Sequence, residues 1–464
     1  MRMPRTALLA LLAVITGSLA FHAYRAEHPT TSYQSADERS YGKLAVGIAD
    51  RHTYGNGLKD PLHWPPGAPM LFAAGHAIAP DAASAQTFDI PAAYWLQALV
   101  SLGTALAAFG IAALLAGAWA GVAAAALVGL YPPLILATGE QISEPLGAFC
   151  LTLAFLAFVV AARRGRVWLF AAGGLALGAA VLTRADLLPV PFVLGPLVAL
   201  WTWRAAGDAR RGLVVGGAIL GGALLAIAPW SVYASDRAGE FVPVTRGSAS
   251  ALFVGTYLPG GGTTVGMKRS LGAAARRRNP KLRGKADFDL EARSVLAVVA
   301  ARHPDLDFNR AVALEARRNV SRYVRADPAG YARMMLNKVQ RMWSRYARGG
   351  ARHTSPFIRG WHILIVLLAF AGLVLGIARR RSLLLACILA AALTSTAIHM
   401  LVVAQARYNL PLMPALLAGG VAGWAMFLRG QRRGGPAAGR EATRGAADAP
   451  RSGAERLPSA ASAE

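Results

Sequence analysis

The chain alternates between long apolar runs and short polar connections over most of its length. The apolar runs extend over about 7–21, 91–119, 120–138, 142–162, 167–183, 187–203, 212–233, 361–378, 382–404 and 410–428. Most of them can cross a hydrocarbon core of roughly 30 Å as a helix, which satisfies its own backbone hydrogen bonds in lipid. The pattern therefore predicts an all-α polytopic membrane protein with about ten transmembrane helices.

Two long polar segments interrupt this pattern. The first, residues 28–90, follows the first apolar run and is punctuated by Gly and Pro, which predicts loops and short helices. One helix is expected at Asp37–Arg51, where apolar residues recur at helical spacing on one face. The second segment, residues 234–358, precedes the last three runs and is expected to be larger and rich in helix.

The second segment carries several local signals of its own. It opens with an apolar, β-like piece at Glu240–Val244. One helix is expected from Phe308 to Arg325, and the next has Asp327 as its N-cap and Pro328 at its first position. The apolar face of that last helix, from Tyr331 to Trp343, predicts a helix that lies on the membrane surface.

Composition supports the membrane class. Of the 464 residues, 55% are hydrophobic and 16% charged, the mean hydropathy is +0.40, and the formal net charge is +25. A soluble chain carries about 25% charged residues. No aromatic and basic nucleic-acid module accompanies the charge, so anionic lipid head groups or phosphate-bearing substrates are the expected partners, not nucleic acid. Cys150 and Cys387 lie inside apolar runs and predict no disulfide.

Arginine clusters in the short connections predict the orientation. They lie at 163–166, 204–211, 379–381 and 429–433. With ten spans and a cytoplasmic N-terminus, every cluster falls on the cytoplasmic side, which is where Lys and Arg accumulate. Both termini are then cytoplasmic, and residues 28–90 and 234–358 face outward. The first run also suits a cleaved signal peptide, because it has a basic start and small residues near its end.

A division of the chain follows from this topology. Residues 1–433 are expected to form one transmembrane domain, with its chemistry in the first outer segment, 28–90. Residues 434–464 are rich in Ala, Gly, Ser and Pro, which predicts a disordered cytoplasmic tail.

Asp37 and Glu38 are the first candidates for chemistry. These adjacent carboxylates lie just beyond the first apolar run, and Pro65-Pro66-Gly67 then leads the chain back toward the membrane. Acids also favour the first turn of a helix, so a solvated helix start explains the pair as well. Their position next to a membrane favours a functional role.

Further candidates stand at the outer ends of the apolar runs. They are Lys43, His63, Glu144, Arg184, Asp186, Arg407 and Tyr408. Ionisable groups at membrane depth are costly and usually functional. Each also has a simpler explanation: Glu144 as an acid at a helix start, Arg184 and Asp186 as a local pair, and Arg407-Tyr408 as an interface anchor.

Sequence motifs indicate no cofactor. The pairs Asp287/Asp289 and Asp305/Asp307 have a spacing that can hold a divalent metal, but each precedes a helical pattern, where capping explains it as well. The chain has no Gly-rich nucleotide motif, no metal-spaced Cys/His set and no Gly-x-Ser-x-Gly. A divalent metal is therefore not indicated.

Six stretches carry a resemblance to a known family. They are Ala36–Tyr41, Trp64–Pro69, Ile142–Leu146, Leu182–Asp186, Pro229-Trp230 with Gly239–Val244, and Ala406–Pro411. In this order they resemble the GT-C superfamily of integral-membrane glycosyltransferases. The similarity is to the bacterial branch related to protein O-mannosyltransferases and the aminoarabinose transferase of lipid A. Trp64 stands where the lipid A branch has a Lys before Pro-Pro, so the substrate of neither relative carries over.

The resemblance implies a fold, an activity and roles. It implies a GT-C fold that transfers a sugar from a polyprenyl-phosphate donor to a glycan, lipid or protein of the cell envelope, outside the cytoplasm of a bacterium, with inversion. The acceptor hydroxyl needs a base, for which Asp37 is the candidate, with Glu38 assisting. The leaving phosphate needs positive charge, for which Arg184 and Arg407 are the candidates, with Lys43 and His63 behind them.

Two other classes of protein stay open. A transporter or flippase of a lipid-linked glycan would carry ionisable groups in the middle of its spans and internal pseudo-symmetry. Here the charges lie at the outer ends and a long outer loop is present instead. A catalytically inactive scaffold of the same fold would show the same sequence features.

Overall fold

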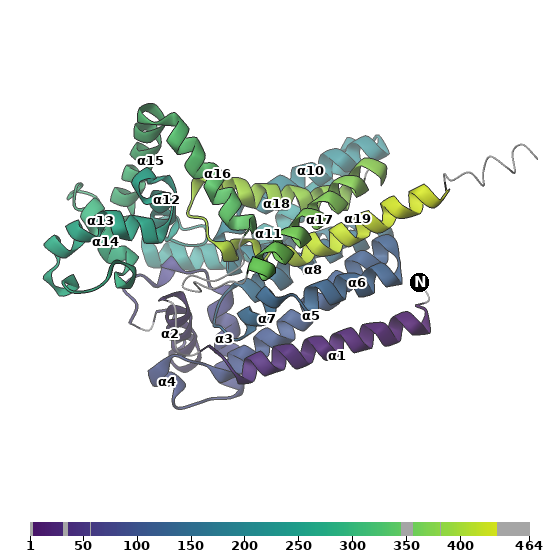
Figure 1. The fold of residues 1–464 in the computed structure, drawn as a ribbon, viewed down its shortest axis with the longest axis horizontal. Coiled ribbons are helices and arrows are strands. Elements are labelled where there is room, and N and C mark those ends of the chain that lie inside the picture. The colour runs from purple at the N-terminus through teal and green to yellow at the C-terminus, as the bar shows by residue number, and fades with distance from the viewer. Residues whose placement is uncertain (1–2, 31–35, 56, 345–355, 381, 434–464) are drawn as a thin grey trace, which may run out of the picture.

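The computed structural model describes residues 3–30, 36–55, 57–344, 356–380 and 382–433, and the tail predicted at 434–464 lies outside this part (Figure 1). Within these ranges the chain is helical and contains no strand. The longer helices are α1 (Arg5–Glu27), α2 (Ala36–Arg51), α3 (Gly67–Ile78), α5 (Pro91–Ala116), α6 (Ala118–Gly129), α7 (Pro132–Thr138), α8 (Glu144–Arg164), α9 (Val167–Thr183), α10 (Pro189–Ala206), α11 (Ala209–Ala238), α12 (Ser248–Thr256), α13 (Thr264–Arg278), α14 (Ala292–Ala300), α15 (Phe308–Ala326), α16 (Pro328–Ser344), α17 (Pro356–Arg380), α18 (Leu383–Leu401) and α19 (Met413–Arg433). The shorter elements are α4 (Ser84–Thr87) and the 3₁₀ turns η2 (Pro61–His63), η3 (Ala185–Leu187), η4 (Leu258–Gly260), η5 (Pro280–Leu282), η6 (Asp287–Asp289) and η7 (Ala406–Asn409).

The predicted membrane class is confirmed. In the described part of the chain, seven helices are long and apolar enough to cross a membrane, and α6 with α7, bent by 51°, raises the number to eight. The two other predicted spans correspond to α9 and to 413–429, which are apolar but shorter helices. At 17 residues α9 is about 26 Å long, less than a typical hydrocarbon core of roughly 30 Å, so the predicted count of about ten is not confirmed.

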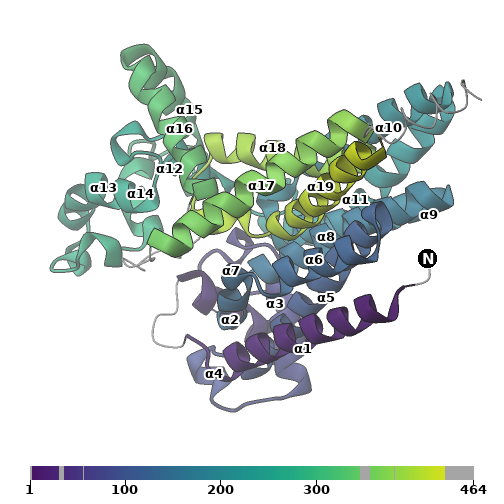
Figure 2. The same cartoon turned by 45° about the vertical axis from the view of Figure 1, so that its right-hand side comes forward.

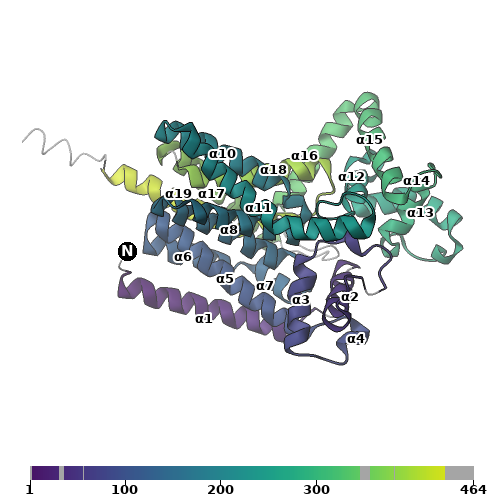
Figure 3. The ribbon, with the colours of Figure 1, turned by 180° about the vertical axis from the view of Figure 1, so that it is seen from behind.

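The two ends of the bundle differ. In Figures 1 and 3, α2 and α4 lie with α12–α15 at one end, while the start of α1 and the end of α19 lie at the other. At that second end, Arg163 of α8 donates to the Leu114 carbonyl of α5, and Arg429 of α19 lies against Gly117. The arginine clusters at 163–166 and 429–433 therefore lie at the same end of the bundle as the start of α1, whose Ala7 packs on α6.

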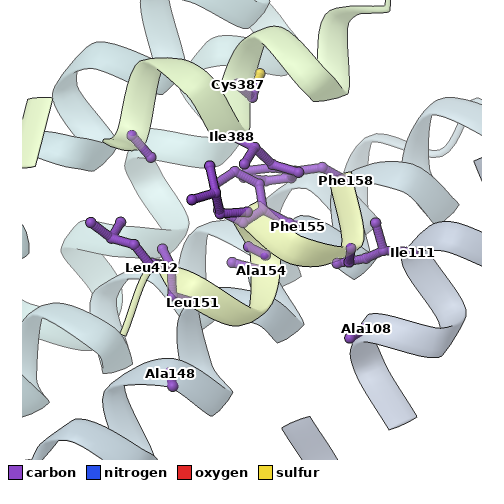
Figure 4. Packing of buried hydrophobic residues seen from close by; sticks show 14 of the residues in the cluster. Ala108, Ile111, Ala148, Leu151, Ala154, Phe155, Phe158, Cys387, Ile388 and Leu412 are labelled. Carbon is purple, nitrogen blue, oxygen red and sulfur yellow. The ribbon is translucent and has the colours of Figure 1, made fainter. Parts of the chain in front are cut away.

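The core of the bundle joins helices that are distant in sequence. Figure 4 shows Ile111 of α5, Phe155 and Phe158 of α8, Ile388 of α18 and Leu412 packed together. Small residues let the helix backbones approach, because a Cβ on Gly174 of α9 would meet the Ile219 carbonyl of α11. Such close approach through small residues is typical of helices packed within a membrane.

Helices α12–α15 form a second apolar cluster beyond the end of the bundle. The chain between α18 and α19 joins it, because Val403 belongs to this cluster and its amide donates to the Ala251 carbonyl of α12 at 3.0 Å. Figure 2 shows α15 and α16 projecting from the bundle as a pair. The second outer segment is therefore anchored to the turn that precedes α19.

Three local predictions for the outer segments can be compared with the structure. The helix predicted at Asp37–Arg51 is α2, and the one predicted from Phe308 is α15. The N-cap prediction for α16 is also confirmed, because Asp327 Oδ1 accepts from the Gly330 amide at 2.8 Å. These signals are local, so they do not depend on the tertiary arrangement.

Two other predictions for this region were wrong. The β-like piece at Glu240–Val244 forms no strand, because side chains of α11 bond its carbonyls: Trp230 Nε1 donates to the Val244 carbonyl at 2.7 Å. The apolar face of α16 does not point to a membrane surface, because Met334 and Met342 on it are buried against other parts of the protein. Helix α16 packs on α15, α17 and α18.

Candidate active site

Asp37 lies in the first turn of α2, at the end of the bundle that carries the two long polar segments, 28–90 and 234–358. Its Oδ2 pairs with Arg407 Nη2 at 2.5 Å, and its Oδ1 accepts a long hydrogen bond from Trp64 Nε1 at 3.4 Å. The side chain of Asp37 is 36% exposed, so one side of the carboxylate stays accessible. Both contacts come from segments far from α2 in sequence, and they determine where this carboxylate points.

Arg407 comes from η7, in the turn between α18 and α19. Besides Asp37, its Nε lies 3.3 Å from Glu144 Oε1 and donates to Gln405 Oε1 at 3.1 Å. The guanidinium of Arg407 therefore bridges the first outer segment and the start of α8. Its side chain is 15% exposed.

Glu144 connects the two arginines that the sequence analysis selected. It begins α8, and its side chain is 1% exposed. The same oxygen that faces Arg407 lies 3.1 Å from Arg184 Nη1. A carboxylate this deeply buried is costly unless it is paired, and here two guanidinium groups share it. The explanation of Glu144 as an ordinary acid at a helix start does not account for these two pairs.

Arg184 and Asp186 form the local pair that the simpler explanation predicts. Both residues also belong to the network that includes Glu144 and Arg407. Arg184 Nε lies 3.2 Å from Asp186 Oδ1, and its guanidinium also lies 5.0 Å from the centre of the Tyr408 ring. Tyr408 also faces Arg407 at 5.8 Å. One connected network therefore holds Asp37, Glu144 and Asp186 with Arg184 and Arg407.

His399 is a member of the network that the sequence analysis missed. Its Nε2 lies 3.6 Å from Asp186 Oδ2, and its ring centre lies 4.8 Å from that of Tyr408. His399 is buried near the end of α18. An ionisable residue inside an apolar run is a signal of function that could have identified it.

Small residues bring these elements together. A Cβ on Gly67, at the start of α3, would lie 2.6 Å from Thr183 Oγ1 and 2.9 Å from Thr183 Cα, so only Gly permits this approach. A Cβ on Gly147 of α8 would lie 3.2 Å from Arg184 Cδ. The Pro65-Pro66-Gly67 stretch thus packs on the end of α9, from which Arg184 emerges.

The electrostatics keep the network charged. Burial alone would raise the pKa of Asp37, but the charge and hydrogen bond of Arg407, with smaller contributions from Trp64 and His63, hold it below its ordinary value of 3.8. Burial would lower the pKa of Arg407, but Glu144 and Asp37 raise it well above the ordinary value. At neutral pH Asp37 is therefore an ionised carboxylate beside a charged guanidinium.

The other predicted site residues lie around the network. His63 stacks edge-on against Trp64 at 4.7 Å, and burial lowers its pKa although Asp37 acts in the opposite direction. Glu38 is buried beside Asp37. Lys43 of α2 lies over the Phe88 ring at 5.2 Å. Of the two adjacent acids, Asp37 is the one that pairs with Arg407.

The Asp-x-Asp pairs have structural roles in the described chain. Asp307 caps α15, where its Oδ1 accepts from the Asn309 amide at 2.9 Å, and Asp287 pairs with Arg276 at 2.5 Å. Within the part of the chain that the structure describes, no group of three or more His, Cys, Asp or Glu side chains could hold a metal ion.

Comparisons with known proteins find similarity only at the level of solved structures. No protein-family model and no curated protein matches the chain. The oligosaccharyltransferase AglB from Archaeoglobus fulgidus, in complex with an inhibitory peptide and a dolichol-phosphate, is similar with a TM-score of 0.49 and 13% identity over 91% of this chain. The match covers 50% of AglB, so this chain spans about half of that protein's length. ArnT from Cupriavidus metallidurans bound to undecaprenyl phosphate is similar with a TM-score of 0.41 and 18% identity, covering 89% of this chain and 77% of ArnT.

Proposed function

We propose that this protein is a GT-C glycosyltransferase that moves a sugar from a polyprenyl-phosphate carrier to an acceptor hydroxyl, with inversion at the anomeric carbon. The observation that carries the proposal is the network itself. Two guanidinium groups, those of Arg184 and Arg407, and the partly exposed carboxylate of Asp37 converge at one end of an apolar helical bundle. The guanidinium groups can bind a phosphate, and the carboxylate can take a proton from a hydroxyl bound next to it.

The two arginines suit the phosphate of the donor. Guanidinium groups bind phosphate through charge-assisted hydrogen bonds, and at low dielectric they stabilise the charge that develops on a leaving phosphate. Glu144 holds both arginines in position, and Asp186 holds Arg184 as well. In the described structure, Glu144 Oε1 and Arg184 Nε are buried and make ion pairs but no hydrogen bond, so the network can accept a further polar group.

Asp37 suits the acceptor. In the reaction the acceptor oxygen attacks the anomeric carbon while Asp37 takes the hydroxyl proton, and the bond from that carbon to the phosphate oxygen breaks. The electron pair of this bond leaves with the polyprenyl phosphate, which gains one negative charge. General bases of this kind contribute a factor of roughly 10²–10⁴ to the rate. Glu38, as the neighbouring acid, orients the acceptor or assists.

Arg407 couples the two halves of the reaction. Its pairing with Asp37 depresses the pKa of that carboxylate and so makes it a weak base in the free protein. A donor phosphate competes with Asp37 for the guanidinium, and this competition raises the proton affinity of Asp37. The base therefore strengthens when the donor is bound.

The apolar helices, in this proposal, provide the surface along which the polyprenyl tail lies. The protein is a bacterial plasma-membrane enzyme with cytoplasmic termini, residues 1–433 form one domain, and residues 28–90 face outward. The acceptor is a glycan, lipid or protein of the cell envelope. His63 and Tyr408 contribute to the substrate region around the network, and Lys43 of α2 is a further candidate for substrate binding.

Sugar transfer by purified protein in membranes tests the proposal, with a labelled sugar on undecaprenyl phosphate as donor and envelope extract as acceptor. Asp37→Asn is expected to lower transfer by roughly 10²-fold or more. Asp208→Asn is the matched control, because Asp208 caps α11 and Asn caps a helix equally well. Full transfer by folded Asp37→Asn protein would show that Asp37 is not the base. Movement of intact donor across the bilayer without transfer would indicate a flippase instead.

A further inference from the structure

A cavity of about 440 Å³ lies in the outer part of the protein, separate from the arginine network. This volume is within the range of small-molecule sites, which is roughly 300–1,000 Å³. Its lining comes from two segments, residues 53–62, which end in η2, and the end of α11 with the stretch after it. The lining residues are Thr53, Gly55, Gly57, Leu58, Lys59, Asp60, Pro61, Leu62, Arg237 and Arg246.

One short piece of chain links the cavity to Asp37. Leu62 lines the cavity, and two residues later Trp64 Nε1 donates to Asp37 Oδ1. Two hydrogen bonds hold this piece in place: the Arg246 amide donates to the Leu62 carbonyl at 2.8 Å, and the Tyr54 hydroxyl donates to the Trp64 carbonyl at 2.9 Å. The stretch from Leu62 to Trp64 therefore connects the lining of the cavity to Asp37. Burial lowers the pKa of His63 within this stretch, and the charges of Asp37 and of Asp60, which lines the cavity, both oppose that shift.

The lining of the cavity carries a surplus of positive charge. Within the described part of the chain, Lys59 and Arg237 make no ion pair. Asp60, the only acid of the lining, is neutralised by Arg293 at 3.2 Å. Arg246 pairs with Glu240 at 2.9 Å, but its buried Nε has no hydrogen-bond partner among the described residues. A ligand with an anionic group would find three cationic side chains at the cavity.

The height of the cavity above the membrane core allows two sources of such an anion. From Ala209 to Arg237, α11 rises about 42 Å, which exceeds the hydrocarbon thickness of roughly 30 Å. A helix of this length extends beyond the hydrocarbon core, and Arg237 stands in its last turn. Both a lipid head group and a soluble molecule can reach this position.

We propose that this cavity is the acceptor subsite, and that Lys59, Arg237 and Arg246 bind an anionic group of the acceptor, a phosphate or a carboxylate. The inference rests on the proposed function, because it assigns Asp37 as the base that the acceptor must reach. Anchoring the acceptor by its charge fixes the hydroxyl next to the base and leaves Arg184 and Arg407 for the donor phosphate.

Binding of inorganic pyrophosphate, measured by calorimetry, tests the subsite. The full chain is placed in phosphatidylcholine nanodiscs with excess undecaprenyl phosphate, which occupies the donor phosphate site. The triple variant Lys59→Gln/Arg237→Gln/Arg246→Gln is expected to bind pyrophosphate about tenfold more weakly than wild type, or worse. The control Lys281→Gln/Arg283→Gln/Arg317→Gln removes the same charge from exposed positions outside the cavity and is expected to stay within about twofold of wild type.

The outcomes separate this inference from the proposed function. Equal weakening in both triple variants, or no saturable binding to wild type, would overturn the subsite. Retained undecaprenyl-phosphate binding shows that the variants are folded. Competition by phosphatidylglycerol in the nanodiscs would assign the anion to a lipid, and unchanged affinity would assign it to a soluble acceptor. A wild type that binds pyrophosphate in the cavity but transfers no sugar would refute the proposed function alone.

Discussion

Arg407 Nη2 lies 2.5 Å from Asp37 Oδ2, and this ion pair joins two residues that are 370 positions apart in the chain. The same guanidinium lies 3.3 Å from Glu144. The candidate base is therefore linked to the residues that would hold the donor phosphate. Any change in Arg407 acts on both the charge of the site and the proton affinity of Asp37.

Arg407→Gln is expected to move the acid limb of the transfer reaction to higher pH. In the wild type the pKa of Asp37 is held below 3.8, and removal of the guanidinium leaves burial, which raises it. The acid limb of kcat/KM reports the free protein and should shift upward by about one pH unit or more. The measurement is transfer as a function of pH, with Arg310→Gln, at an exposed position, as the control.

The same pair has a predictable effect on stability. Because the folded-state pKa of Asp37 is depressed, its contribution to stability is present above pH 3.8 and is lost as the pH falls through the folded-state pKa. Arg407→Gln removes this contribution. In the pH profile of transfer, an acid limb at the same pH in Arg407→Gln and wild type would show that Arg407 does not control the pKa of Asp37.

Glu144→Ala is expected to destabilise the protein by about 3–5 kcal/mol, because it leaves two guanidinium groups without the carboxylate that they share. Arg184 is the more affected of the two, since its side chain is only 7% exposed. Glu144→Gln keeps an acceptor oxygen and should recover part of the loss. Thermal unfolding of the purified protein in detergent measures both, and equal stability of Glu144→Ala and wild type would contradict the shared pair.

Gly67→Ala is expected to lower both stability and transfer. The added methyl would meet the backbone at Thr183, which cannot move without displacing the end of α9 and with it Arg184. Overpacking of this kind costs roughly 1–3 kcal/mol. Gly217→Ala in α11 is the matched control, because a Cβ there meets nothing within 4 Å and Ala is favoured over Gly in a helix by about 1 kcal/mol. If Gly67→Ala unfolds at the same temperature as wild type, the close approach at Gly67 is not required.

Lys338 of α16 is buried, and its Nζ donates to the Met400 carbonyl at 2.6 Å and the Gly255 carbonyl at 3.0 Å. Both carbonyls belong to the last turn of a helix, of α18 and of α12, where the partial charge is negative. The ammonium therefore joins the second outer segment to the bundle next to His399. Burial, with the nearby charge of Arg341, nevertheless lowers the pKa of Lys338 to about 7.

The stability of the wild type is expected to increase with pH because of Lys338, and Lys338→Met is expected to remove this increase. Between the folded-state pKa of about 7 and the ordinary value of 10.5, the unfolded chain binds this proton and the folded chain does not. Wild-type stability should therefore increase with pH in that window by about 1.4 kcal/mol per unit at most. Unfolding temperatures between pH 7 and 9 measure the effect, and exposed Lys281→Met serves as the control. Parallel curves for wild type and Lys338→Met would refute the prediction.

Several features could be predicted from the sequence because they are local. The apolar runs determine the helical membrane class, since a buried backbone in lipid has few alternatives to a helix. The caps of α15 and α16 follow from Asp307 and Asp327, which bond to amides two or three residues away. The polar residues just beyond the ends of the apolar runs could also be identified directly, and they include Asp37, Arg184 and Arg407.

Other features were decided only by the tertiary structure. Helical periodicity shows which face of α16 is apolar, but either lipid or another part of the protein can bury such a face. Here other helices bury it. Glu144 could be read as an acid at a helix start, but its sharing between Arg184 and Arg407 depends on how α8, α9 and η7 pack. His399 is part of the network for the same reason. Ion pairs between distant segments are a product of helix packing, which no local pattern of residues specifies.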